Sequence, residues 1–257
     1  MRIAILSDIH GNPIALDAVL ADVQRQGPID EYWILGDLVA IGYDPVTVLE
    51  RVTKLPRVRF TRGNTDRYVV SDELPISIEQ IQAQSRLELL PKLLSTVKSF
   101  AWTKGYLTAT GWLDWLGRLP LEQRLTLPDG TRLLGVHAAP GTDDGPGIHP
   151  RLSEAELEAL VKDCNADLIC VGHTHIPLDR TVSGIRVVNL GSVSNPVTPE
   201  LVASYAIVKA NNSGYQLQLR RVPYDREAVM EAIRRVRHPA SDYLLGFMRG
   251  EFVAKQG

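Results

Sequence analysis

Short apolar runs separated by helix-like segments dominate the first third of this chain. The runs have the length of buried strands and cover residues 2–7, 31–35 and 57–60. Between them, apolar residues recur at helical spacing after Pro13, and Asp44-Pro45 is typical of the start of a second helix over 45–54. Strands that alternate with helices in this way predict a parallel α/β sheet.

Residues 71–120 interrupt this alternation. The ranges 79–100 and 111–119 have helix-like patterns, and three tryptophans, Trp102, Trp112 and Trp115, lie near their ends. We expect these tryptophans to pack in the core, which is the commonest role of large aromatic side chains. The segment is too short for an independent domain. We therefore expect a single domain over 1–257 with a small helical insert, or cap, at 71–120.

Strand-like runs return in the second half of the chain. They cover 122–137, with a turn at 128–130, and then 167–171, 185–190, 203–209 and 215–222. Ser153 and Glu156 form a capping box for a predicted helix over 153–163, and Asp225 caps a last helix that ends at Arg237. The sequence Asn211–Gly214 predicts a hairpin turn between the last two strands.

Composition and charge exclude several classes of protein. The 257 residues are 44% hydrophobic and 23% charged, with a formal net charge of −2. The chain therefore has no overall attraction for nucleic acid or an anionic membrane. No apolar run approaches the roughly 20 residues that a membrane span needs, and Met1-Arg2 leaves no room for a signal peptide. The two cysteines do not form a C-x-x-C pair, so we expect a cytoplasmic protein without disulfides.

Polar side chains with the chemistry of metal ligands follow several of the predicted strands. They are Asp8, His10, Asp37, Asn64, His137, His173 and His175. A single histidine at a strand end is more often a hydrogen-bonded core residue than a ligand, and a single Asp-x-His arises easily by chance. Here four of six histidines recur at strand ends, where the ligands of open α/β sheets bind. Because imidazole is the commonest protein ligand of transition metals, the pattern predicts a metal site.

The order and spacing of these motifs resemble the calcineurin-like metallophosphoesterases. That family is recognised by Asp-x-His, Gly-Asp, Gly-Asn, a later His and Gly-His-x-His, and all five occur here in that order. The resemblance is closest to the small bacterial and archaeal phosphodiesterases with a Gly-Asn-x-Asp motif, which is Gly63-Asn64-Thr65-Asp66 in this chain. The segment Asn189–Val193 is similar to the Asn-Pro-Gly-Ser loop of the same group.

This resemblance implies a four-layer α/β/β/α sandwich with two metal ions at the strand ends. By the same resemblance, Asp8, His10 and His175 hold one metal, Asn64, His137 and His173 hold the other, and Asp37 bridges them. A set of carboxylate, amide and imidazole ligands suits manganese, iron, nickel or zinc. Two dications and two carboxylates leave the site about two charges positive, which attracts phosphate and acidifies a bridging water to the attacking hydroxide.

The sequence gives weaker signals for side chains that act in catalysis beyond holding the metal ions. Asn64 and His137 are candidates for catalysis as well as for metal binding. Many family members have histidine where this chain has Thr65, and a threonine cannot protonate a leaving group at neutral pH. His149, in the loop 141–150, is the spare candidate for a general acid, although a loop histidine without a role is the commoner case.

Two further residues of the same motifs have alternative explanations. Asp66 orients a ligand or caps local backbone amides, and orientation is favoured because metal ligands commonly have such partners. Arg62 contacts the substrate phosphate or is a structural arginine.

The leading hypothesis is therefore a binuclear metal-dependent phosphodiesterase that acts on a small phosphoester, with nucleotides among the candidate substrates. The alternatives are a phosphomonoesterase or protein phosphatase of the same superfamily, or a non-catalytic binding scaffold on the same fold. A filled set of ligand positions argues against the scaffold. The oligomeric state is left open by the sequence.

Overall fold

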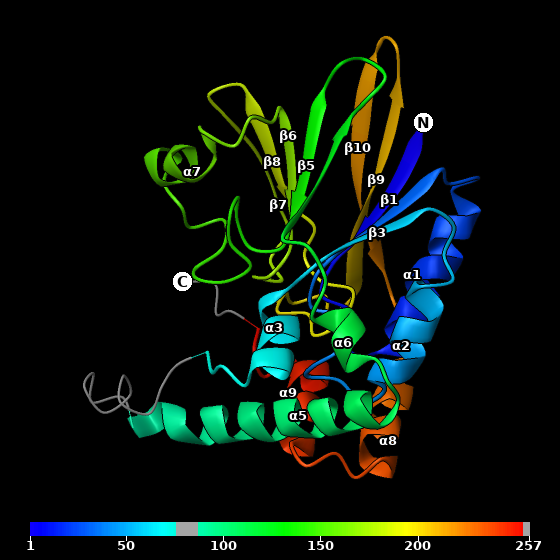
Figure 1. Cartoon of the computed structure of the whole chain (residues 1–257), viewed down its shortest axis with the longest axis vertical. Coiled ribbons are helices and arrows are strands. Elements are labelled where there is room, and N and C mark those ends of the chain that lie inside the picture. Colours follow the sequence, from blue (N-terminus) through cyan, green and yellow to red (C-terminus); the bar gives the residue numbers. More distant parts are fainter. Residues whose placement is uncertain (76–86, 254–257) are drawn as a thin grey trace.

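Two five-stranded sheets form the centre of the computed structural model, which describes residues 1–75 and 87–253 (Figure 1). In the first sheet the order is β10-β9-β1-β2-β3, with β1, β2 and β3 parallel and β9 antiparallel to β1. Its strands are β1 (Arg2–Leu6), β2 (Glu31–Leu35), β3 (Val58–Thr61), β9 (Ala203–Asn211) and β10 (Gly214–Val222).

The second sheet has the order β4-β5-β6-β8-β7, and β5, β6 and β8 are parallel. Its strands are β4 (Glu122–Thr126), β5 (Arg132–Val136), β6 (Leu168–Val171), β7 (Leu178–Val182) and β8 (Ile185–Asn189). Buried side chains from both sheets, among them Ile5, Trp33, Leu133 and Val188, form one apolar cluster between them. The sheets therefore pack face to face.

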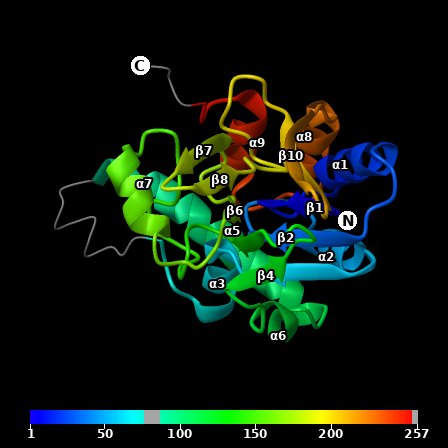
Figure 2. The same cartoon turned by 90° about the horizontal axis from the view of Figure 1, so that it is seen from above.

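Helices cover the outer faces of the two sheets (Figures 1 and 2). The apolar cluster on the outer side of the first sheet includes residues of α1 (Pro13–Arg25), α2 (Pro45–Val52), α3 (Asn64–Ser71), α5 (Leu90–Ala109), α6 (Leu113–Leu116), α8 (Arg226–Arg235) and α9 (Ser241–Arg249). Of these, α5 packs against α2, α3, α6 and α9 and lies beyond the ends of the strands (Figure 1). Helix α7 (Glu154–Val161) packs on the second sheet through Leu157 and Val161. The order helix, sheet, sheet, helix confirms the predicted four-layer sandwich.

Local sequence signals account for where several helices begin. Helix α2 starts at Pro45, and the side chain of Asp44 accepts a hydrogen bond from Thr47 N at 3.1 Å. Ser153 and Glu156 form the predicted capping box of α7, and Asp225 caps α8. These caps pair backbone N–H groups that have no partner within the helix, so the start of a helix is readable from sequence.

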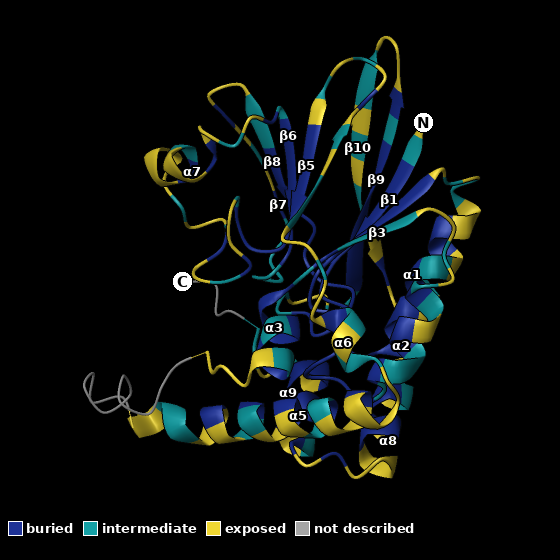
Figure 3. Ribbon diagram, viewed as in Figure 1, coloured by how far each residue is buried: buried dark blue, intermediate teal, exposed yellow. Residues whose placement is uncertain are grey.

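The segment 71–120 differs from its prediction in detail. Residues 76–86 lie outside the described residues, and so does the predicted start of the helix at 79. From a short 3-10 turn (Leu87–Leu89), α5 continues to Ala109 rather than ending at Phe100. The predicted end was wrong because Thr103, Lys104 and Gly105 interrupt the helical pattern just after Phe100, yet the helix continues through them with Thr103 buried. Figure 3 shows buried and exposed residues alternating along α5.

The same segment joins the main core. Phe100, Leu107 and Leu116 belong to the apolar cluster that α1 and α2 form with the first sheet. The prediction of core packing holds in part: Trp112 and Trp115 are half-buried and pack against this cluster, with Trp115 meeting Phe60 edge to face at 5.1 Å. Trp102 is also half-buried, but it packs on His238 outside the cluster. The single domain over 1–257 and the insert at 71–120 stay predictions.

Strand β7 and helices α3 and α9 have no counterpart among the predicted elements. No described helix is long and apolar enough to cross a membrane.

Candidate metal centre

Chain segments from both sheets meet where β1, β2, β5 and β6 end. The backbone N–H of Asp8 donates to Gly36 O at 3.1 Å, and that of His10 donates to Asp37 O at 2.9 Å. In the second sheet, Gly172 N donates to His137 O at 2.9 Å. Between the two sheets, His173 N donates to Asp8 Oδ2 at 3.0 Å, so polar residues from distant parts of the sequence meet at the carboxyl ends of these strands.

Two glycines allow the chain segments that follow the strands to lie close to one another. A Cβ atom at Gly172 would lie 2.2 Å from Asp8 Oδ2, and one at Gly63 would lie 2.2 Å from Asp37 Oδ1. Any other residue at these positions would collide with a carboxylate of the cluster. The glycines of the Gly-Asn and Gly-His motifs are therefore required by close packing rather than by flexibility.

Five of the predicted ligands have an unusual backbone conformation. Their φ angles are positive: 57° for Asp8, 48° for His10, 52° for Asp37, 67° for His173 and 59° for His175. Such angles cost of order 1–3 kcal/mol for a residue with a side chain and persist only where the surroundings enforce them. Strain of this kind gathers at functional sites, and here it directs side chains of consecutive motifs toward one point.

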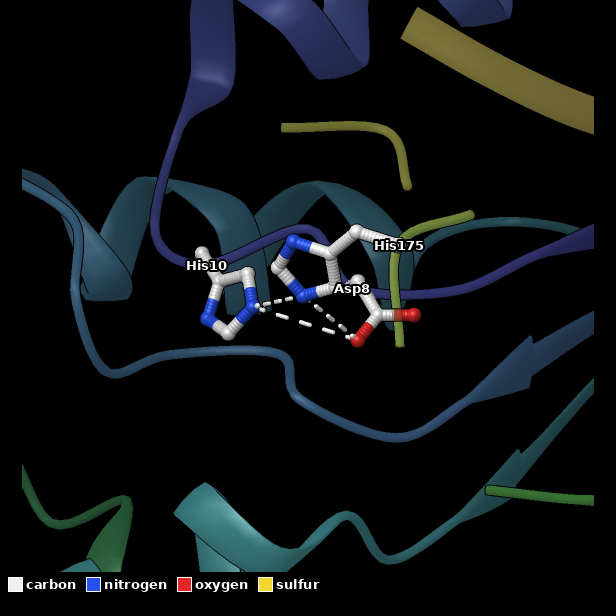
Figure 4. Close-up of side chains that lie close together, drawn as sticks. All are labelled: Asp8, His10 and His175. Atoms are coloured by element: carbon white, nitrogen blue, oxygen red, sulfur yellow. Dashed lines mark hydrogen bonds and ion pairs between the residues drawn. The ribbon is translucent and has the colours of Figure 1, made fainter. Parts of the chain in front are cut away.

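Asp8, His10 and His175 form the first group of converging side chains (Figure 4). Nδ1 of His10 donates to Ala40 O, and Nδ1 of His175 donates to Asn195 O, both at 2.7 Å. Each ring therefore directs Nε2 inward, and the two Nε2 atoms lie 3.1 Å apart. Lone pairs at this distance repel unless a positive charge lies between them. Asp8 Oδ1 lies 3.1 Å from His175 Nε2 and completes the group.

Asn64, His137 and His173 form the second group. Nδ1 of His137 donates to Leu35 O at 2.7 Å, and Nε2 of His173 donates to Gly145 O at 2.9 Å. The remaining ring nitrogens, Nε2 of His137 and Nδ1 of His173, lie 3.1 and 3.0 Å from Asn64 Oδ1. Three lone-pair donors thus face one position in this group as well.

Asp37 lies between the two groups. Its Oδ2 is 3.7 Å from His10 Nε2 and 3.4 Å from His137 Nε2. Its Oδ1 accepts the backbone N–H of Thr65 at 2.9 Å, which fixes the orientation of the carboxylate. One oxygen atom of Asp37 thus faces a histidine of each group. The carboxylate of Asp8 also lies near both, because ligand atoms of Asp8, Asp37 and His137 are all within 4.8 Å of one another.

The buried carboxylates make the cluster attractive to positive charge. Burial by itself lowers the pKa of His137, but the carboxylates of Asp37 and Asp8 raise it to about 10. Burial likewise raises the pKa of Asp37, but the charge and hydrogen bond of His137 outweigh burial and hold this pKa well below its usual range. The field of the site therefore favours protons or metal cations at the inner nitrogens. Carboxylate, amide and imidazole donors with this convergence fit divalent metal ions.

Asp66 accepts hydrogen bonds from the two backbone segments that carry the candidate ligands Asp37 and Asn64. Its Oδ1 accepts Leu38 N at 2.9 Å, and its Oδ2 accepts Gly63 N at 3.0 Å. The side chain is fully buried, and burial together with the charge of Asp37 raises its pKa to about 7. Asp66 thus caps backbone amides and, by doing so, orients the segments of Asp37 and Asn64.

Arg62 is paired within the protein. Its Nε lies 2.6 Å from Asp143 Oδ2, and Asp143 is almost fully buried. This ion pair favours the structural explanation of Arg62, and a contact with substrate stays a prediction.

Thr65 and His149 differ in their distance from the cluster. Thr65 follows Asn64 and is buried, and its hydroxyl has no hydrogen-bond partner among the described residues. His149 Nδ1 accepts the backbone N–H of Arg151 at 3.3 Å, and its ring lies near Glu156 at the start of α7. Among the described residues, no hydrogen bond or ion pair joins the His149 side chain to either group.

We expect His149→Ala to change kcat/KM by no more than about threefold, because general-acid catalysis is worth roughly 10²–10⁴ and needs hydrogen-bond reach. The measurement compares a diester with a good leaving group and one with a poor leaving group across the accessible pH range. A loss confined to the poor leaving group would restore His149 as the general acid.

Sequence reasoning missed the partners that orient the predicted ligands. The four carbonyl oxygens that fix the histidine rings belong to the backbone of Leu35, Ala40, Gly145 and Asn195, and the side chains there carry no signal of this role. Asn189 was noted only for its motif, but its Nδ2 donates to Gly172 O at 2.7 Å and holds the turn before His173.

The fold and this cluster agree with the comparison of the chain with known protein families. Residues 1–213 match the calcineurin-like phosphoesterase superfamily domain, and the chain belongs to that superfamily. The protein is therefore a hydrolase of phosphoesters from a family that uses divalent metals.

Two relatives by sequence span different shares of the chain. An uncharacterized protein of Methanocaldococcus jannaschii is 29% identical over 256 residues, which cover 92% of this chain and 93% of that protein. The symmetrical bis(5'-nucleosyl)-tetraphosphatase of Erwinia tasmaniensis is 38% identical over 169 residues, or 65% of this chain. That match spans 52% of the Erwinia enzyme, so the present chain corresponds to about half of its length.

Two solved structures share the fold over nearly the whole chain. A metallophosphoesterase of Sphaerobacter thermophilus has a TM-score of 0.72 and 25% identity, and the match covers 96% of this chain and 99% of that one. A hypothetical protein of Pyrococcus horikoshii has a TM-score of 0.79 at 24% identity, with 97% and 98% of the two chains covered. The second likeness is one of fold alone.

Proposed function

We propose that this protein is a two-metal phosphodiesterase, with Asp8, His10 and His175 holding one divalent ion, Asn64, His137 and His173 holding the other, and Asp37 between them. The observation that carries the proposal is the convergence of two sets of lone pairs on two adjacent positions. In each set the ring hydrogens are committed to backbone carbonyl oxygens, so the inner atoms are free to bind cations.

The chain contributes position and charge to the reaction. Bound metals supply Lewis acidity and an activated water for in-line displacement at phosphorus. Asp37 holds a fixed negative charge between the two sets, and Thr65 N keeps its carboxylate in place. A carboxylate could also bind metal at the position of Asn64, but it would add a negative charge. The neutral amide of Asn64 keeps the site positive and attractive to a phosphate anion.

The preference for diesters rests on the motif Gly63-Asn64-Thr65-Asp66, which resembles that of the small phosphodiesterases and has Thr65 where many family members have histidine. The hydroxyl of Thr65 cannot act as a general acid at neutral pH, and the described contacts bring no histidine to that position. Substrates whose leaving groups need little protonation are therefore favoured. A phosphate group that leaves as part of a nucleotide meets this condition, and the Erwinia relative is named for such a substrate. Dinucleoside polyphosphates are for this reason the second candidate substrate class.

The test is one panel of substrates and metals on protein freed of metal by chelation. We expect bis(p-nitrophenyl) phosphate to be hydrolysed faster than p-nitrophenyl phosphate after reconstitution with manganese, iron, nickel or zinc, and neither before reconstitution. A dinucleoside tetraphosphate in the same panel tests the second class. Faster monoester hydrolysis with every metal would overturn the diesterase proposal, and no hydrolysis of any substrate would favour a binding scaffold.

A further inference from the structure

The backbone group that orients His173 lies on an exposed stretch of the loop after β5. Nε2 of His173 donates to Gly145 O at 2.9 Å, and Gly145 is itself exposed. A Cβ atom at Gly147 would lie 2.6 Å from His173 Cδ2, so the same stretch also packs against the ring. The direction of the inner nitrogen of His173 therefore depends on where this stretch of the loop is held.

Residues 141–148 have few local means to hold that position. Three of the eight are glycines. A Cβ atom added at Gly141 or Gly145 would have no described atom within 4 Å apart from its chain neighbours. Glycine loses more conformational freedom on ordering than any other residue, so such a segment needs firm attachment points. One is at its end, where Ile148 O accepts Asn189 Nδ2 at 2.9 Å.

Asp143 provides the other attachment point. It is almost fully buried, and its carboxylate accepts from Arg62 Nε at 2.6 Å and from Arg67 Nε at 3.1 Å. Hydrogen bonds between charged partners of this kind are among the strongest in proteins. Arg62 lies two residues before Asn64, and Arg67 lies one turn after it on α3. One carboxylate thus connects the loop that orients His173 to the segment that carries Asn64.

We propose that Asp143 is a positioning residue: through its two arginines it holds residues 141–148 in place, so that Gly145 O keeps the inner nitrogen of His173 directed at the second group. The inference rests on the proposed function, because it assigns a role within one of its two metal sites. It predicts a selective effect. Loss of the Asp143 carboxylate weakens the binding of the ion of the second group and leaves the ion of the first group as it is.

The test is a calorimetric titration of the metal-free full chain with Mn²⁺. We expect wild-type protein to bind two ions, and Asp143→Asn to bind one of them about tenfold more weakly and the other with unchanged affinity. Loss of a partner that orients a metal ligand usually costs about 10- to 100-fold in affinity. The lower end applies because Arg67 Nη2 still holds the loop through Asp144 at 2.9 Å.

Arg62→Gln separates the effect of position from the effect of charge. Asp143→Asn removes a negative charge, which by itself weakens the binding of a cation. Arg62→Gln removes a positive charge, so electrostatics alone predicts tighter binding of Mn²⁺. The loss of an attachment point predicts weaker binding in both variants, and we expect this result. Arg62→Gln also tests the inference if Asp143→Asn does not fold.

Two histidine variants identify the affected ion, because each is expected to retain one tight Mn²⁺. Asp143→Asn combined with His175→Ala should bind the remaining ion about tenfold more weakly than His175→Ala alone. Combined with His173→Ala, the same substitution should leave the affinity for the remaining ion unchanged. This difference follows because the Asp143 carboxylate acts through the ring of His173 and not through that of His175.

Asp22→Asn is the matched control. Asp22 is also buried, and its carboxylate also accepts from two arginines, from Arg220 Nε at 2.6 Å and from Arg25 Nη2 at 3.1 Å. The variant therefore breaks the same kind of ion pair, but on a side chain outside both groups. It should keep both Mn²⁺ affinities, even if its melting temperature falls.

The outcomes separate the inference from the function on which it rests. If wild-type protein binds fewer than two Mn²⁺ ions, the two-metal function fails and the inference fails with it. If it binds two and Asp143→Asn binds both as tightly, the inference alone is wrong. It is also wrong if Asp143→Asn weakens both ions equally, if Arg62→Gln does not weaken either ion, or if Asp143→Asn weakens the ion that remains in His173→Ala.

Discussion

Asp37→Asn is expected to lower kcat/KM for a phosphodiester by about 10³-fold, or roughly 4 kcal/mol of transition-state stabilisation. The substitution keeps the size of the side chain, and its oxygen can still accept Thr65 N. It removes the negative charge that faces His10 at 3.7 Å and His137 at 3.4 Å. Since this carboxylate lies between the two groups, its loss weakens the binding of both metals.

The measurement combines steady-state kinetics with metal analysis at saturating and at limiting Mn²⁺. Asp22→Asn is the control, because Asp22 is also a buried carboxylate, but Arg220 holds it and lowers its pKa to about 2. That variant should be less stable and should keep its kcat/KM per folded molecule. If Asp37→Asn keeps activity within tenfold of wild type and binds two ions, Asp37 does not bridge the metals.

His173→Ala and His175→Ala are expected to lose different metal ions, although the two histidines are only two residues apart. His175 directs its inner nitrogen to His10 and Asp8, whereas His173 directs its own to Asn64. Each variant should therefore retain about one tight Mn²⁺ per chain. We expect each to lose on the order of 10²–10³ in kcat/KM, since two-metal hydrolysis needs both ions.

Pairs of variants identify which ion each histidine holds. His10→Ala should show the same residual Mn²⁺ affinity as His175→Ala, and Asn64→Ala the same as His173→Ala. His149→Ala is the control and should keep both ions, because its ring lies at Arg151 and Glu156. Loss of both ions from every one of the four variants would mean that the groups do not bind independently.

Much of the fold could be predicted because its signals are local. The strand over 31–35 and the start of a helix at Pro13 agree with β2 and α1, since apolar runs and caps depend on neighbouring residues alone. The end of α5 could not be predicted in this way. Beyond Phe100 its buried residues are Thr103 and Leu107, and the burial of a polar side chain such as Thr103 is decided by the elements packed against it.

The chemistry of the candidate site could also be predicted from the sequence, but its geometry could not. The residue types at the strand ends and their order predict a metal site and the superfamily. The positive φ angles of Asp8 and His175 do not follow from those types, because such angles are unfavourable for both residues in isolation. They arise where segments distant in the sequence, such as Gly172 and Asp8, are packed closely together.

The sequence by itself determined that Gly172-His173-Thr174-His175 brings two imidazoles to the end of a buried strand. The resemblance to the superfamily implied that the two rings serve different metals, but only the tertiary structure decided which nitrogen of each ring faces inward. The physical reason is that ring hydrogens follow their acceptors. The acceptors are carbonyl oxygens of Gly145 and Asn195, which distant segments of the chain bring to the site.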